Sequence, residues 1–98
     1  MEIIQNKKES ALNVELIGRL DTTTAPQLET ALSTALEGIT ALTFDLKQLE
    51  YISSAGLRIL LAAQKTMNKQ GTMTVANANA EIREVFDITG FSDILTLL

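Results

Sequence analysis

The sequence predicts an α/β domain built on a mixed, mostly parallel sheet of four to five strands. Two short apolar runs open the chain, and the polar link between them predicts an antiparallel hairpin. After the hairpin, segments typical of helices alternate with segments typical of strands, which implies crossover connections between parallel strands. The length of 98 residues fits one domain, residues 1–98, and the 46% of hydrophobic residues supports a real core.

The first two predicted strands form the hairpin. Ile3 and Ile4 indicate a short first strand. Residues Leu12–Leu16 alternate between apolar and polar side chains, which is the period-two pattern of a half-buried strand. We expect the polar residues Asn6–Ser10 to close the hairpin and Gly18 to end the second strand.

The first predicted helix follows Thr24. Its apolar residues recur at the spacing of one helix face: Leu28, Ala31, Leu32, Ala35 and Leu36. Thr24 and Gln27 have the spacing of a capping box, and Pro26 fits the first helical turn, where its missing N–H is not needed. Gly38 is the expected C-terminal stop.

A largely apolar run, Ala41–Leu46, predicts a buried central strand that continues towards Tyr51 and Ile52. We interpret Asp45, within this run, as a strand-end carboxylate bonded to nearby backbone. The second helix has its core residues at Leu57, Leu60, Leu61 and Met67. This helix is expected to end near Gly71.

The last part of the chain predicts one more strand and one more helix. Met73 and Val75 indicate the strand, and Asn77 or Asn79 can cap the helix. The core face of that helix is Ile82, Val85, Phe86 and Thr89. Gly90 followed by Phe91 is typical of a Schellman ending, and residues 94–98 offer a short final edge strand.

Composition excludes several classes of function. The net charge of −4 and the pI of about 4.6 argue against nucleic-acid binding, which needs clustered cations. The chain has no cysteine and no histidine, which excludes disulfides, a Ser-His-Asp triad and a phosphohistidine carrier. We expect no metal and no cofactor. No apolar run reaches the roughly 18 residues of a membrane span and no secretory signal is visible, so we expect no membrane insertion and a cytoplasmic protein.

The candidate functional segment is the turn from Tyr51 to Leu57, which joins a predicted strand to a predicted helix. Ser54 is a good N-cap candidate there, and the small residues Ala55 and Gly56 leave the turn open to close approach. A helix N-terminus is positively polarised and tolerates a phosphate, which would add about −1.5 to −2 charges. The simplest alternative is that Ser54 only caps the helix.

Three segments of the chain resemble the STAS domain family, the anti-sigma-factor antagonists of bacterial partner-switching pathways. They are Leu49–Arg58, Gly18–Asp21 with the threonine-rich turn that follows it, and Phe86–Phe91. The resemblance covers essentially the whole chain. It implies a single STAS-like domain with its helices packed mainly on one face of the sheet.

The resemblance also implies a signalling function without enzymatic activity. In this family the unphosphorylated antagonist binds an anti-sigma factor that is also a serine kinase, and a sigma factor is thereby released. The kinase phosphorylates the serine at the helix start, which abolishes binding, and a serine phosphatase removes the phosphate. In this sequence the corresponding serine is Ser54.

The same resemblance places partner contacts around the serine turn. They are Asp21, Thr22, Thr23, Ser53, Gly56 and Arg58. Ser53 stands where well-characterised antagonists have an aspartate, so Ser53 is an alternative phosphorylation target. Asp21 can equally cap a turn, and Gly56 by itself indicates packing or backbone clearance rather than a phosphate-binding loop.

Two other functions stay open. The chain can be a STAS scaffold subunit of a lipid-transport or stress-signalling assembly that is never phosphorylated, which the serine at position 53 favours. It can also be a small enzyme with Ser54 as nucleophile, although Lys65 would then be an unsupported base.

Overall fold

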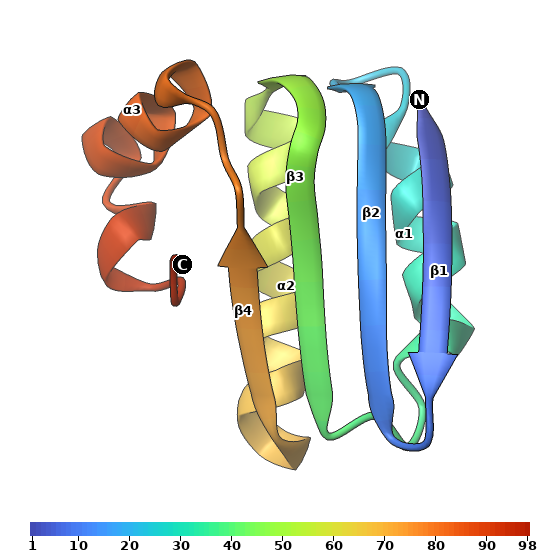
Figure 1. The fold of residues 1–98 in the computed structure, drawn as a ribbon. Coiled ribbons are helices and arrows are strands. Elements are labelled where there is room, and N and C mark those ends of the chain that lie inside the picture. Colours follow the sequence, from blue (N-terminus) through green and yellow to red (C-terminus); the bar gives the residue numbers. More distant parts are fainter.

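The computed structural model describes all residues, 1–98, and shows a four-stranded sheet in the order β1-β2-β3-β4 (Figure 1). The elements are β1 (Glu2–Lys8), β2 (Ala11–Leu20), α1 (Ala25–Ala35), β3 (Ala41–Ile52), α2 (Ser54–Gln70), β4 (Thr72–Ala76), α3 (Ala80–Thr89) and the 3₁₀ helix η1 (Phe91–Asp93). Strand β1 pairs with β2 in antiparallel fashion, whereas the pairs β2–β3 and β3–β4 are parallel. The predicted α/β class and the mixed, mostly parallel sheet are confirmed.

Helices α1 and α2 cover one face of the sheet, and α3 lies beside its β4 edge (Figure 1). One cluster of 23 buried apolar residues forms the core. Leu16 and Phe44 from the strands and Leu60 from α2 are completely buried within it. The prediction that the helices pack mainly on one face is therefore confirmed.

The hairpin is longer than the sequence pattern indicates. Strand β1 runs to Lys8, so the turn consists only of Glu9 and Ser10, and Glu9 has a φ of +58°. Strand β2 continues past Gly18, which has a φ of +104° at a shift in the β2–β3 register. The predicted link at residues 6–10 and the predicted strand end at Gly18 were wrong. The length of β1 was underestimated because an alternation of apolar and polar residues marks only strands with one buried face, and almost all of β1 is exposed.

The end of the chain is only partly as predicted. Asn79 caps α3 by accepting a hydrogen bond from the Ile82 N–H at 2.8 Å, and Gly90 ends the helix with a left-handed φ of +81°. Both predictions are confirmed. The expected final strand at residues 94–98 is reduced to one isolated bridge between Val75 and Leu97, because η1 occupies the preceding residues.

The buried face of helix α2 differs from the predicted one at one position. Leu61 is only half-buried, whereas Gln64 is 8% exposed. The prediction of Leu61 as a core residue was therefore partly wrong, because the face of α2 that contacts the sheet includes position 64.

Candidate functional site

The candidate site lies at the carboxyl ends of β2 and β3, where these parallel strands lead into α1 and α2 (Figure 1). Leu20 and Ile52 are paired at the ends of the two strands. The backbone N–H of Ser53 donates a hydrogen bond of 2.9 Å to the carbonyl of Leu20. This bond holds the start of α2 beside the loop that begins at Asp21, so the two predicted parts of the site are adjacent.

Ser53, and not Ser54, is the N-cap of α2. The Ser53 hydroxyl accepts a hydrogen bond from the Gly56 N–H at 3.3 Å, and its backbone is extended, as an N-cap requires. Ser54 is the first helical residue and its side chain is exposed. The predicted cap was wrong by one residue, because adjacent serines offer the same chemistry and only the backbone geometry selects between them. The hydroxyl of Ser54 is thus not used for capping.

Asp21 organises the loop before α1. Its Oδ1 accepts hydrogen bonds from the backbone N–H of Thr23 at 3.0 Å and of Thr24 at 3.1 Å. The bond from the Thr24 backbone is the main cause that lowers the pKa of the Asp21 carboxyl. Desolvation opposes this effect, while the bond from the Thr23 backbone, the Thr24 hydroxyl and the Arg19 charge add to it. Asp21 therefore carries a full negative charge at neutral pH.

Thr24 belongs to this turn and does not form the predicted capping box with Gln27. Its hydroxyl accepts from the Asp21 N–H at 2.9 Å and donates to the Arg19 carbonyl at 2.8 Å. The N-terminus of α1 consequently has no side-chain cap, although Pro26 occupies the first turn as predicted. The predicted capping box was wrong because the Thr24 hydroxyl is already hydrogen-bonded to the backbone of Asp21 and Arg19.

Arg19 and Tyr51 extend the site; both lie in segments that the sequence singled out, but neither was assigned a partner contact. They are partners in the β2–β3 ladder, and the Arg19 guanidinium lies 4.3 Å from the centroid of the Tyr51 ring. The same guanidinium is 3.8 Å from Asp21, measured from Nε to Oδ2. Only the register of the parallel strands brings the three side chains together, and no local sequence signal gives that register.

The remaining predicted contacts fall into two groups. Thr22, Thr23 and Arg58 are exposed, and Arg58 follows Ser54 by four residues, which places both on one face of α2. Gly56 is buried instead. A Cβ there would lie 2.6 Å from Leu20 Cγ. Gly56 therefore allows close contact between α2 and the strand ends, and the proposed partner surface does not include it.

Asp45 lies in the middle of β3, away from the serine turn. It accepts hydrogen bonds from the Lys47 N–H at 3.1 Å and from the Asn77 amide at 3.0 Å. Burial works to raise its pKa, but these two bonds and the Lys47 charge together lower it. The expected bond from Asp45 to nearby backbone is confirmed, with Asn77 as an additional partner, but the expected position at a strand end was wrong, because β3 continues to Ile52.

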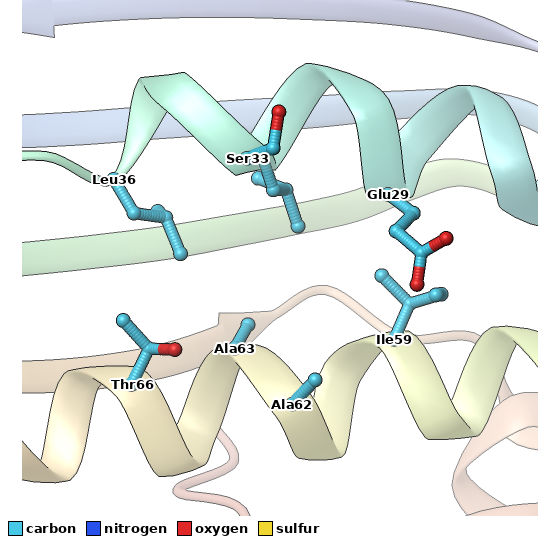
Figure 2. Close-up of a pocket in the computed structure, with 8 residues that line it drawn as sticks. Glu29, Ser33, Leu36, Ile59, Ala62, Ala63 and Thr66 are labelled. Atoms are coloured by element: carbon cyan, nitrogen blue, oxygen red, sulfur yellow. The ribbon is translucent and has the colours of Figure 1, made fainter.

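Two apolar grooves are open on the surface. The first lies between α1 and α2 and has a volume of about 190 Å³ (Figure 2). It is lined by Glu29, Leu32, Ser33, Leu36, Ile59, Ala62, Ala63 and Thr66. The second lies between the carboxyl end of β3 and α3 and has a volume of about 240 Å³. It is lined by Tyr51, Ile52, Glu81, Ile82, Glu84, Val85 and Ile88.

The structure contains no cluster of three or more acidic, histidine or cysteine side chains with the geometry to hold a metal ion. None of its helices combines the length and the apolar character that crossing a membrane requires.

Comparison with known proteins gives consistent similarities over nearly the whole chain. The family model described as STAS domain matches residues 2–98. The Bordetella bronchiseptica protein described as anti-sigma factor antagonist BtrV is 35% identical over 96 residues, which is 96% of this chain and 83% of that protein. The anti-sigma-B factor antagonist of Bacillus subtilis is 31% identical over 98 residues, covering 99% of this chain and 88% of the relative. The crystal structure of an anti-sigma factor antagonist from Mycobacterium paratuberculosis has a TM-score of 0.89 at 27% identity, covering 98% of this chain and 83% of that one.

Proposed function

Because this chain belongs to the STAS domain family, we propose that it is an anti-sigma-factor antagonist that binds an anti-sigma factor and thereby releases a sigma factor. The names of two relatives above 30% identity support this proposal. The observation that carries it is the exposed Ser54 at the first position of α2, beside the charged Asp21 loop. Such a protein is a binding regulator and not an enzyme, and it acts in the cytoplasm, where sigma factors work.

The proposed switch is phosphorylation of Ser54 by the anti-sigma factor itself, acting as a serine kinase. The positively polarised start of α2 tolerates a phosphate, and the cap formed by Ser53 stays in place when Ser54 is modified. The phosphate adds about −1.5 to −2 charges next to Asp21, which changes the surface offered to the partner without unfolding the domain. Binding is then lost until a serine phosphatase restores the hydroxyl.

Ser54 is a better target than Ser53 for a structural reason. The Ser53 hydroxyl is bonded to the Gly56 N–H, so a kinase would have to break the cap before transferring phosphate to it. The Ser54 side chain is exposed and does not cap the helix. We therefore propose Ser54 as the regulated residue, with partner contacts from Ser53, Arg58 and the loop of Asp21, Thr22 and Thr23.

The test is to mix the purified chain with each anti-sigma factor kinase encoded in its own genome, first with ADP and then with ATP. We expect a complex that releases sigma factor, followed by phosphorylation at Ser54, mapped by mass spectrometry, and dissociation. Ser54→Ala should bind without being phosphorylated, and Ser54→Asp should bind at least about tenfold more weakly. Thr30→Asp, which adds the same charge at an exposed position of α1 outside the lining of the groove between α1 and α2, is the matched control.

Two outcomes would contradict the proposal. The absence of any complex, together with no phosphate on Ser54 or Ser53, would remove the antagonist function. Equal binding by wild type and Ser54→Asp would instead make the chain a constitutive scaffold subunit.

A further inference from the structure

We propose that the groove between β3 and α3 is a second part of the partner surface, which receives an apolar side chain of the anti-sigma factor flanked by basic residues. This inference rests on the proposed function and names a contact that the serine turn does not provide. The groove is the one lined by Tyr51, Ile52 and five residues of α3. It is called the α3 groove below.

The α3 groove lies at the same end of the molecule as the serine turn. Ile52, which lines it, directly precedes Ser53, the cap of α2. The start of α3 is held at this end because the Asn79 amide donates a hydrogen bond of 3.2 Å to the carbonyl of Leu49 in β3. Figure 1 shows α3 beside the point where β3 turns into α2. A partner that covers Ser54 is therefore close to the groove.

Some of the apolar side chains that line the groove are exposed to solvent. Ile88 is 77% exposed and Tyr51 is 39% exposed, and both are among the few large hydrophobic residues at the surface. Val85, which also lines the groove, is half-buried. Tyr51 is held in position by the Arg19 guanidinium stacked over its ring. A groove that combines a fixed aromatic side chain with exposed aliphatic side chains is typical of a protein-binding pocket.

The rim of the groove is acidic. Glu81 and Glu84 line it and neither forms an ion pair within the chain. The one cation of α3, Arg83, points its guanidinium to the carbonyl of Leu98 at 3.5 Å. Arg19, near Tyr51, is already paired with the Asp21 carboxylate. The complementary partner surface therefore carries Lys or Arg beside the inserted apolar side chain.

The serine turn alone is a poor anchor for a stable complex. Its exposed side chains, those of Thr22, Ser54 and Arg58 among them, are mostly small or polar. Specific interfaces bury about 800 Å² on each partner and depend on a few well-packed anchors, often Tyr and Arg. The α3 groove adds an aromatic anchor, Tyr51, and an apolar pocket close to the regulated serine.

The groove between α1 and α2 does not fit this role equally well. Figure 2 shows it running along the two helices from Glu29 and Ile59 to Leu36 and Thr66. Ile59 lies more than one helical turn after the start of α2, so this groove leads away from the serine turn. Its lining contains one carboxylate, that of Glu29, whereas the α3 groove has two.

The test measures affinity for the anti-sigma factor by calorimetry, with Ile88→Gln and Glu84→Lys as the diagnostic variants. Gln keeps a good helix propensity at position 88, and neither side chain is bonded within the chain, so both variants should melt like wild type. Ile4→Thr, on the opposite edge strand and 41% exposed in wild type, is the control for Ile88→Gln. Glu29→Lys makes the control charge reversal in the groove between α1 and α2.

We expect Ile88→Gln and Glu84→Lys each to weaken binding about tenfold or more, and the two controls to stay within about twofold of wild type. Equal binding by all four variants would overturn the inference and leave the proposed function intact. So would weakening by Glu29→Lys alone, which would move the contact to the other groove. Loss of affinity in Glu84→Lys but not in Ile88→Gln would refute the inserted apolar side chain. If the wild-type chain binds no anti-sigma factor, the proposed function fails and this inference fails with it.

Discussion

Replacing Gly56 by alanine should destabilise the domain, although alanine is the better helix former. Gly56 lies in the first turn of α2, where a Cβ would be 2.6 Å from Leu20 Cγ and 2.9 Å from Ile52 Cγ1. Leu20 is 0% exposed and Ile52 is 3% exposed, so neither side chain can move into solvent. The new methyl group must therefore push α2 away from the ends of β2 and β3.

The expected magnitude is a balance of two terms. Overpacking of a well-packed core costs about 1–3 kcal/mol. Replacing glycine by alanine within a helix contributes up to about 1 kcal/mol in the opposite direction. The net loss in the free energy of unfolding should be about 1–2 kcal/mol, and for a domain of this size each kcal/mol lowers the melting temperature by roughly 4–8 °C.

Urea unfolding followed by circular dichroism measures this loss, and a double-mutant cycle with Leu20→Ala tests its cause. Leu20→Ala alone should cost about 2–5 kcal/mol, because it removes a buried leucine side chain. In the Leu20→Ala background the contact with Leu20 is gone and only the one at 2.9 Å to Ile52 Cγ1 remains, so Gly56→Ala should cost clearly less there than in wild type. The same cost in both backgrounds, or no cost in wild type, would refute the steric explanation.

Three further predictions concern single side chains. Gln64→Leu should raise the free energy of unfolding by about 1 kcal/mol, because Gln64 Oε1 is buried without a hydrogen-bond partner. The substitution also removes the hydrogen bond from Gln64 to Asn68, but Asn68 is exposed and can bond to water instead. Thermal melting measures the change. Asn79→Ala should lower the free energy of unfolding by about 2 kcal/mol in urea titrations, since it removes both the cap on the Ile82 N–H and the bond to the Leu49 carbonyl. Asp21 has a folded-state pKa below its ordinary value of 3.8, so its contribution to stability is present above that value and is lost as the pH falls through the folded pKa. Asp21→Asn should therefore be less stable than wild type at pH 6, with a gap that narrows towards pH 2 in parallel urea titrations.

The periodic elements of the fold could be predicted from the sequence because burial on one side leaves a repeating pattern. The stripe of Leu28, Leu32 and Leu36 identified α1, and the alternation of Leu12, Val14 and Leu16 identified β2, and all six side chains are buried. Strand β1 was underestimated because an exposed edge strand leaves no such pattern. The final strand was overestimated because a short apolar segment does not reveal the turn of 3₁₀ helix before it.

The candidate site was predictable only where its residues are close in the chain. The serine turn and the Asp21 loop have local signatures, and both lie at the site. Arg19 and Tyr51 are separated by more than thirty positions in the sequence, and their contact follows from the irregular β2–β3 ladder, which shifts its register near Gly18. The side chains of the α3 groove meet for a similar reason, since α3 is positioned by the bond from Asn79 to Leu49.

At the start of α2 the helix cap is Ser53 and the proposed phosphorylation target is Ser54, whereas the sequence alone assigns both roles to Ser54. Ser53 accepts the Gly56 N–H, a role that an aspartate at this position would fill equally well, because both are strong N-caps. The serine in place of the aspartate therefore preserves the helix start and removes only one negative charge beside Ser54. With Asp21 already charged nearby, a phosphate on Ser54 meets less repulsion in this chain than it would next to an aspartate. The departure at position 53 is thus compatible with the proposed switch, since Ser53 still caps α2 and adds no negative charge beside Ser54.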